Sequence, residues 1–171
     1  VYEAVQKNKP LFEGIVTVTG KCMTEQRNFR LRVGANMEDV MRAIGGFPKD
    51  AVKLISGGPM MGKAVSRMEA ASVKSTSAFL LLTPEETKRG EEGSCIRCAR
   101  CVDSCPMGLE PYLLNRLSRL NRLEDLEANM VHDCIECGSC VYSCPANIPL
   151  LDTIRHSKTQ VIKIIRSRPK K

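Results

Sequence analysis

The chain has 171 residues, of which 43 % are hydrophobic and 26 % charged, and its formal net charge is +7. This length and composition suit one medium or two small folded domains, and no apolar run approaches the roughly 20 residues of a membrane-crossing helix. Most of the excess positive charge lies in residues 151–171, where seven Lys or Arg and one Asp give +6. Because aromatic residues that could stack on bases make up only 4 % of the chain, we expect no nucleic acid partner.

The first half of the chain is rich in predicted strands. Residues 1–11 carry no initiator Met and no signal segment, and we expect a linker or the remnant of an upstream domain in a longer or processed protein. A β-grasp-like α+β domain is predicted over residues 12–83 because strand patterns and one helix pattern alternate there. The predicted strands are 15–19, 29–33, 52–56 and 78–83. The helix is predicted within 36–46, with Asn36 as its cap and Gly45-Gly46 as its end.

Within residues 51–66, Gly57, Gly62 and Lys63 have the spacing of a phosphate-binding loop, G-x-x-x-x-G-K. Ala64 stands where that loop needs a Ser or Thr hydroxyl, and Pro59 lacks a backbone N–H that the loop would use. No helix pattern follows Lys63. The segment SGGPMMG is therefore predicted to be a glycine-rich turn rather than a nucleotide site.

Nine cysteines are present, and eight of them lie between Cys95 and Cys144, after a polar linker predicted at 84–93. Cys22 stands alone and is expected to be a half-buried small residue. Residues 95–106, CIRCARCVDSCP, and 134–145, CIECGSCVYSCP, share eight of twelve residues at an offset of 39, which indicates an internal duplication. Each copy has the C-x-x-C-x-x-C-x-x-x-C-P pattern of bacterial iron–sulfur sites.

In two-cluster proteins with this pattern, the fourth cysteine of each motif binds the other cluster. We therefore predict two [4Fe–4S] clusters that lie close enough together for electron transfer between them. The ligands predicted for the first are Cys95, Cys98, Cys101 and Cys144; those for the second are Cys134, Cys137, Cys140 and Cys105. Structural zinc also uses C-x-x-C pairs, so a zinc site or a non-redox metal scaffold is the alternative.

The segment between the motifs has leucines at three- and four-residue steps, which predicts helices with one apolar face. That face is expected to comprise Leu113, Leu117, Leu120, Leu123, Leu126 and Met130. The whole of 94–158 is thus predicted to be an α-helical two-cluster ferredoxin domain, followed by a basic tail at 159–171. Residues 149–165 are expected to pack on the cluster domain, and the last cations to contact a partner or lipid.

The two motifs differ in charge. Arg97 and Arg100 are interleaved with the ligands of the first motif, where the second has Glu136 and Ser139. Since positive charge favours the reduced cluster, the first cluster is expected to have the higher reduction potential.

The order VTVTG, SGGPMMG and two CxxCxxCxxxCP motifs, over roughly residues 12–155, resembles the C-terminal part of the C subunit of the Rnf electron-transport complex, an ion-translocating ferredoxin:NAD⁺ oxidoreductase. The resemblance implies a soluble-ligand-binding (SLBB) β-grasp domain followed by the two-cluster domain. It also implies a peripheral subunit on the cytoplasmic face of the inner membrane. Such a subunit relays electrons between an NADH/FMN site and other subunits, ferredoxin-like proteins or flavins.

The family carries its FMN- and NADH-binding domain upstream of these segments, and no G-x-G-x-x-G unit is present here. FMN and NADH are therefore expected only outside this chain, which has no predicted catalytic residue of its own. The cobalamin reductase of propanediol-using microcompartments has the same layout and is the alternative family.

Overall fold

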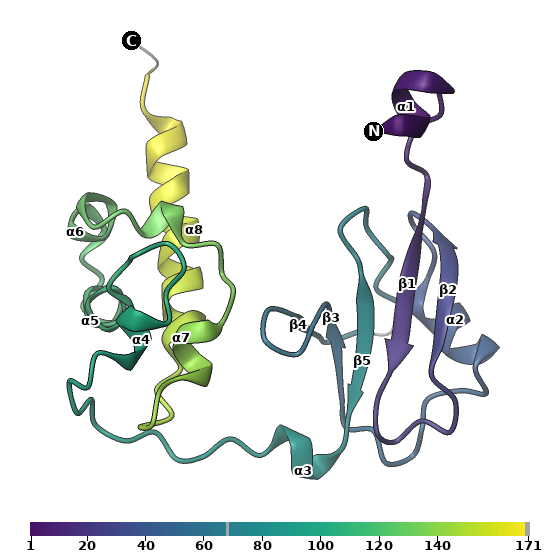
Figure 1. Cartoon of the computed structure of the whole chain (residues 1–171), viewed down its shortest axis with the longest axis horizontal. Helices are drawn as coiled ribbons and strands as arrows, with labels where there is room; N and C mark the ends of the chain where they lie inside the picture. The colour runs from purple at the N-terminus through teal and green to yellow at the C-terminus, as the bar shows by residue number, and fades with distance from the viewer. Residues whose placement is uncertain (68, 170–171) are drawn as a thin grey trace. The chain divides into compact units, whose positions relative to one another are not determined.

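The computed structural model describes residues 1–67 and 69–169 and divides the chain into two compact units, Val1–Lys88 and Arg89–Lys171. The first unit combines a sheet with helices and the second is helical, so the chain is an α+β protein (Figure 1). Residue 88 lies within the predicted linker at 84–93, although the exact domain boundaries remain a prediction. None of the helices in the described ranges is both long and apolar enough to cross a membrane.

The first unit is built on a five-stranded mixed sheet in the order β2-β1-β5-β3-β4. Only the pairing of β1 with β5 is parallel, and the other neighbours are antiparallel. The strands are β1 (Glu13–Thr19), β2 (Arg27–Arg32), β3 (Lys53–Ser56), β4 (Lys63–Val65) and β5 (Ala78–Leu82). The four predicted strands are confirmed with small shifts of their ends, whereas β4 was not predicted. The short helices α1 (Tyr2–Gln6) and α3 (Pro84–Thr87) flank the sheet in sequence.

Helix α2 (Met37–Ala43) packs on one face of this sheet. Alternate strand residues and the apolar side of α2 form the core: Val16, Val18, Leu54, Phe79 and Leu81 from the strands with Met37, Val40 and Met41 from the helix. Cys22 is half-buried against this core, as expected, with its Sγ 3.9 Å from the carbonyl oxygen of Leu81.

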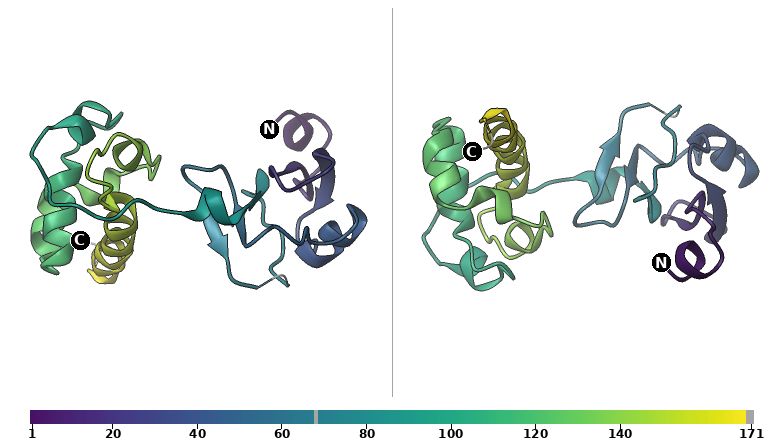
Figure 2. Two further views of the ribbon diagram at one scale, coloured as in Figure 1. Left: turned by 90° about the horizontal axis from the view of Figure 1, so that it is seen from below. Right: turned by 90° about the horizontal axis from the view of Figure 1, so that it is seen from above.

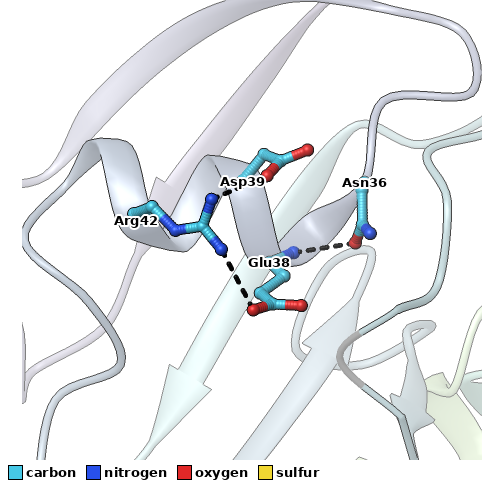
Figure 3. A network of polar contacts seen from close by, with 4 residues as sticks. All are labelled: Asn36, Glu38, Asp39 and Arg42. Atoms are coloured by element: carbon cyan, nitrogen blue, oxygen red, sulfur yellow. Dashed lines mark hydrogen bonds and ion pairs between the residues drawn. The ribbon is translucent and has the colours of Figure 1, made fainter.

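The predicted ends of α2 are confirmed. The Asn36 side chain accepts a hydrogen bond of 3.0 Å from the backbone N–H of Glu38 (Figure 3). Arg42, one turn on, contacts both acidic residues of the first turn. Gly45 and Gly46 follow with φ near +94° and +98°, a left-handed conformation that ends the helix.

The SGGPMMG segment connects β3 to β4 in an antiparallel hairpin, so Lys63 begins a strand and not a helix. This agrees with the prediction of a turn. Gly57 has φ +106°, and the Gly62 N–H donates to the Gly58 carbonyl at 2.8 Å. A phosphate loop needs a helix whose N-terminus faces the anion, and β4 occupies that position.

A side chain at position 62 is expected to destabilise this turn. A Cβ there would overlap Ile55 Cγ2 and lie 2.6 Å from the Gly58 carbonyl oxygen, whereas a Cβ at Gly58 would meet nothing within 4 Å. We expect Gly62→Ala to lower the free energy of unfolding of the first unit by about 1–3 kcal/mol, and Gly58→Ala to change it by under about 0.5 kcal/mol. Urea unfolding followed by far-UV circular dichroism measures both, and equal effects of the two variants would contradict the assignment.

The second unit is helical, and its elements alternate with the cysteine loops. They are α4 (Arg100–Asp103), α5 (Pro111–Arg119), α6 (Leu123–Ala128), the 3₁₀ helix η1 (Val131–Asp133), α7 (Ser139–Tyr142) and α8 (Leu150–Ser167). Pro111 occupies the first turn of α5. Both α5 and α6 contact the long helix α8, and the views from below and above show them beside it (Figure 2).

The core of this unit differs in register from the predicted leucine face. Leu117 and Leu126 are buried and Leu113 and Leu123 pack against the core, as predicted. Leu120 and Met130 are exposed, which corrects the prediction. Leu120 is the C-cap of α5, and Met130 has a left-handed φ of +55° after α6, so the helical repeat no longer applies to either.

Helix α8 supplies the other side of this core. Leu150, Ile154 and Val161 are buried and Ile165 packs against them, which confirms the expected packing of 149–165. The helix continues across the predicted start of the tail at residue 159 to Ser167. Beyond it, the Arg168 guanidinium forms two hydrogen bonds of 2.6 and 2.8 Å with the Glu127 carboxylate at the end of α6. The end of α8 is therefore fixed to α6.

Candidate metal centres

The first cysteine site is a cavity of about 230 Å³. Four cysteines line it, three from the first motif and the last from the second: Cys95, Cys98, Cys101 and Cys144. Cys95 and Cys98 are exposed, and the other two are half-buried. Ile96, Arg97 and Tyr112, which are exposed, also line the cavity, so the site opens to solvent beside the first motif.

The second cysteine site is the reciprocal one. It is lined by Cys134, Cys137 and Cys140 of the second motif and by Cys105, the last cysteine of the first. All four are half-buried, and the cavity is much tighter, about 20 Å³. Apolar side chains surround it, among them Leu109, Leu114 and Ile154 of the helical core. The two lining sets contain the same cysteines as the two predicted ligand sets.

Both motifs form the same loop. Arg97 and Glu136, which follow the first cysteine by two residues, have φ of +56° and +57°. Ala99 and Gly138, two residues further on, have φ of +60° and +82° and precede α4 and α7. These left-handed residues turn the backbone between successive cysteines, and only Gly138 indicates this in the sequence.

Several of the half-buried thiols are also crowded by neighbouring thiols. Burial, together with the nearby Cys134 and Cys137, raises the pKa of Cys140 to about 12. Burial likewise raises the pKa of Cys101 and of Cys134. A bound metal core would provide the positive charge that neighbouring thiolates need in order to ionise together, because metal coordination deprotonates a thiol.

The same electrostatic interactions link cysteines across the two motifs. After burial, the charges of Cys144 and Cys95 contribute to the raised pKa of Cys101, and that of Cys105 contributes to the raised pKa of Cys134. Cys101 also contributes to the raised pKa of Cys140, so the two sets of thiols lie close to each other. The duplicated motifs thus interlock rather than forming two separate loops.

Helix α8 contributes two cations to the second site, which the sequence did not predict. The Glu136 carboxylate receives a 2.7 Å hydrogen bond from Arg155 Nε and lies 3.3 Å from Lys158 Nζ. Lys158 Nζ also donates to the Cys134 carbonyl oxygen at 2.6 Å. Burial of Glu136 opposes its ionisation, but the two cations outweigh burial and lower its pKa. The only sequence signal was that Arg155 and Lys158 lie three residues apart, on one side of a helix.

Ser139 provides a further contact in the second loop. Its Oγ lies 3.5 Å from Cys137 Sγ, and hydrogen bonding with the side chain and the backbone N–H of Ser139 lowers the pKa of Cys137. The pKa of Cys137 is therefore shifted in the opposite direction to those of Cys134 and Cys140.

Within residues 1–67 and 69–169, no group of three or more His, Cys, Asp or Glu residues is arranged to hold a single metal ion. The donor chemistry of each cavity, four cysteines with no His, Asp or Glu among the other lining residues, fits an iron–sulfur cluster. The first cavity has room for such a group, whereas the side chains of the second would have to move apart to admit it.

Two domain families match the chain. The family model of the SLBB domain matches residues 15–64, and that of the 4Fe-4S dicluster domain matches residues 88–145, which contain both motifs. Together they cover the sheet of the first unit up to β4 and the cysteine sites of the second.

Curated relatives match most of the chain. It is 40 % identical over 119 residues to the C subunit of the proton-translocating ferredoxin:NAD⁺ oxidoreductase complex of Clostridium ljungdahlii. It is 40 % identical over 158 residues to the C subunit of the ion-translocating oxidoreductase complex of Rhodobacter capsulatus. A third relative, the C subunit of the Na⁺-translocating ferredoxin:NAD⁺ oxidoreductase complex of Acetobacterium woodii, is 38 % identical over 162 residues. These matches cover 70, 92 and 95 % of this chain but only 26, 30 and 37 % of the three relatives.

Proposed function

Since this chain is homologous over most of its length to a segment of the C subunits of ion-translocating oxidoreductase complexes, we propose that it transfers electrons within such a subunit. One observation carries the proposal. Two cavities in one helical unit are each lined by four cysteines, drawn from both motifs, and the thiols of the two sets lie close enough to influence one another.

Each cysteine set would hold one [4Fe–4S] cluster, which supplies one-electron chemistry when bound. The protein residues would provide the thiolate ligands, keep the two sets adjacent and surround the second with apolar side chains. Because two of the first set are exposed and all of the second are half-buried, the first site is the one at which electrons would be exchanged with another protein.

The proposed setting is a membrane complex. The subunit would lie peripherally on the cytoplasmic side of the inner membrane and exchange electrons with other subunits, ferredoxin-like proteins or flavins. NADH and FMN would bind in a part of the subunit outside these 171 residues. The first unit would be a β-grasp SLBB domain, a proposal supported by its mixed sheet with one covering helix and by the SLBB match at residues 15–64.

Anaerobic reconstitution with iron and sulfide tests the electron-transfer proposal. We expect dithionite to reduce the protein to a state with [4Fe–4S]⁺ EPR signals, and oxidised ferredoxin or flavin to reoxidise it. A Cys22→Ala variant is the matched control, since Cys22 lies in the first unit, and it should behave like the unaltered chain. A reconstituted protein that binds zinc, or that binds iron but is not reduced and reoxidised, would contradict the proposal and support a structural metal.

A further inference from the structure

The two cysteine loops differ in how their central charges are held. Arg97 and Glu136 occupy equivalent positions in loops of the same backbone conformation. Arg97 is exposed at the rim of the first cavity, and its guanidinium has no ion pair within the part of the chain that the structure describes. Glu136 is held by two cations of α8. The duplication has therefore produced one loop that faces solvent and one that is fastened to a helix.

The charged group at the second loop carries a net positive charge. Arg155 and Lys158 contribute two positive charges against the one negative charge of Glu136. Apart from the cysteines, none of the residues that line the second cavity is ionisable. The Asp133 carboxylate, in η1 just before Cys134, lies 3.6 Å from His132 Nε2 and is exposed, so solvent and salt screen its charge. Lys158 is thus a cation in direct contact with the backbone of a cysteine of the second set.

Because this charged group is half-buried, it should influence the reduction potential of the nearby cluster more strongly than the exposed arginines of the first motif do. The exposed fractions of the Lys158, Arg155 and Glu136 side chains are 17, 21 and 27 %. Arg97 and Arg100, in contrast, are both exposed. Water and salt screen an exposed charge strongly, whereas a half-buried charge acts through a lower effective dielectric.

We infer that Lys158, with Arg155 and Glu136, is a positioning group that raises the reduction potential of the second cluster above that of the first. The inference rests on the proposed function. The step concerned is the addition of one electron, supplied by dithionite in the experiment below, to [4Fe–4S]²⁺ to give [4Fe–4S]⁺, with no bond made or broken. A nearby cation stabilises the more negative product. The order is the opposite of the one that Arg97 and Arg100 predict from the sequence.

Potentiometric titration of the two-cluster protein, monitored by EPR, tests the inference. We expect Lys158→Gln to lower the higher midpoint potential by about 59 mV, which for one electron is a tenfold decrease in the equilibrium constant for reduction. Lys158→Arg should retain most of the potential. Lys163→Gln is the matched control, an exposed lysine further along α8, and it should move neither midpoint. A Cys95→Ala variant, which lacks a ligand of the first cluster, identifies the signal of the second.

A second variant separates an electrostatic role from a structural one. Glu136→Gln removes a negative charge while keeping the side-chain shape, so it should raise the same midpoint that Lys158→Gln lowers. If both variants move that midpoint in one direction, or neither moves it while the EPR spectra stay intact, the inference is wrong. It is also wrong if Arg97→Gln lowers the higher of the two midpoints. Failure of dithionite to reduce either cluster in the unaltered protein would instead contradict the proposed function.

Discussion

Combining Cys95→Ala with Cys144→Ala should remove one cluster, whereas combining Cys95→Ala with Cys105→Ala should remove both. The reason is the crossed lining of the two cavities, in which Cys144 belongs with the first motif and Cys105 with the second. Each single variant loses one cluster under any pairing, so only the double variants reveal which cysteines share a cluster. Alanine is preferred to serine because a serine oxygen could replace the thiolate as a ligand.

Iron and acid-labile sulfide per chain, after anaerobic reconstitution, measure the outcome. We expect about eight iron atoms in the unaltered chain, about four in the Cys95/Cys144 double variant and nearly none in the Cys95/Cys105 double variant. The reverse result for the two double variants would mean that each motif binds its own cluster. The retained cluster of the first double variant should also lose the EPR broadening that arises when two reduced clusters lie close together.

Local patterns predicted the elements whose residues interact with near neighbours in the sequence. The Asn36 cap, the strand alternation and the cysteine spacing all belong to this class, and the structure follows them. The crossed lining of the cavities joins residues that are distant in the sequence, and it was predicted from the ligation typical of this repeated motif, in which the fourth cysteine of each copy belongs with the other copy. The structure brings the predicted sets together in space, although their role as ligands remains a prediction.

Other features that depend on distant residues were missed. Strand β4 has three residues and forms through pairing with β3, so it has no alternation of its own to detect. The leucine face was displaced because Leu114 is buried against α8 while Leu120 lies beyond the end of α5. Lys158 acts on a loop twenty-four residues earlier in the chain, and the net charge of residues 151–171 does not reveal that contact.

Leu126→Ala should be the most destabilising apolar substitution in the second unit. The Leu126 side chain has 0 % exposure and packs with Val131, Leu150 and Ile154 in the core that joins α6 to α8. Helix α6 has six residues and is too short to be stable without this packing. Removing the buried side chain costs both its transfer free energy and the cavity left behind, about 3–5 kcal/mol.

The matched control is Leu120→Ala, whose side chain is 59 % exposed and which should change the free energy of unfolding by under about 0.5 kcal/mol. Urea unfolding of the reconstituted protein by circular dichroism gives the two values, and bleaching of the visible cluster absorbance follows cluster release in the same samples. Because η1 and the second cysteine loop continue directly from α6, loss of this packing should also release iron at a lower urea concentration. Equal unfolding midpoints for the two variants would contradict the core assignment. Unfolding without earlier iron release in Leu126→Ala would show instead that the cysteine loops are held independently of α6.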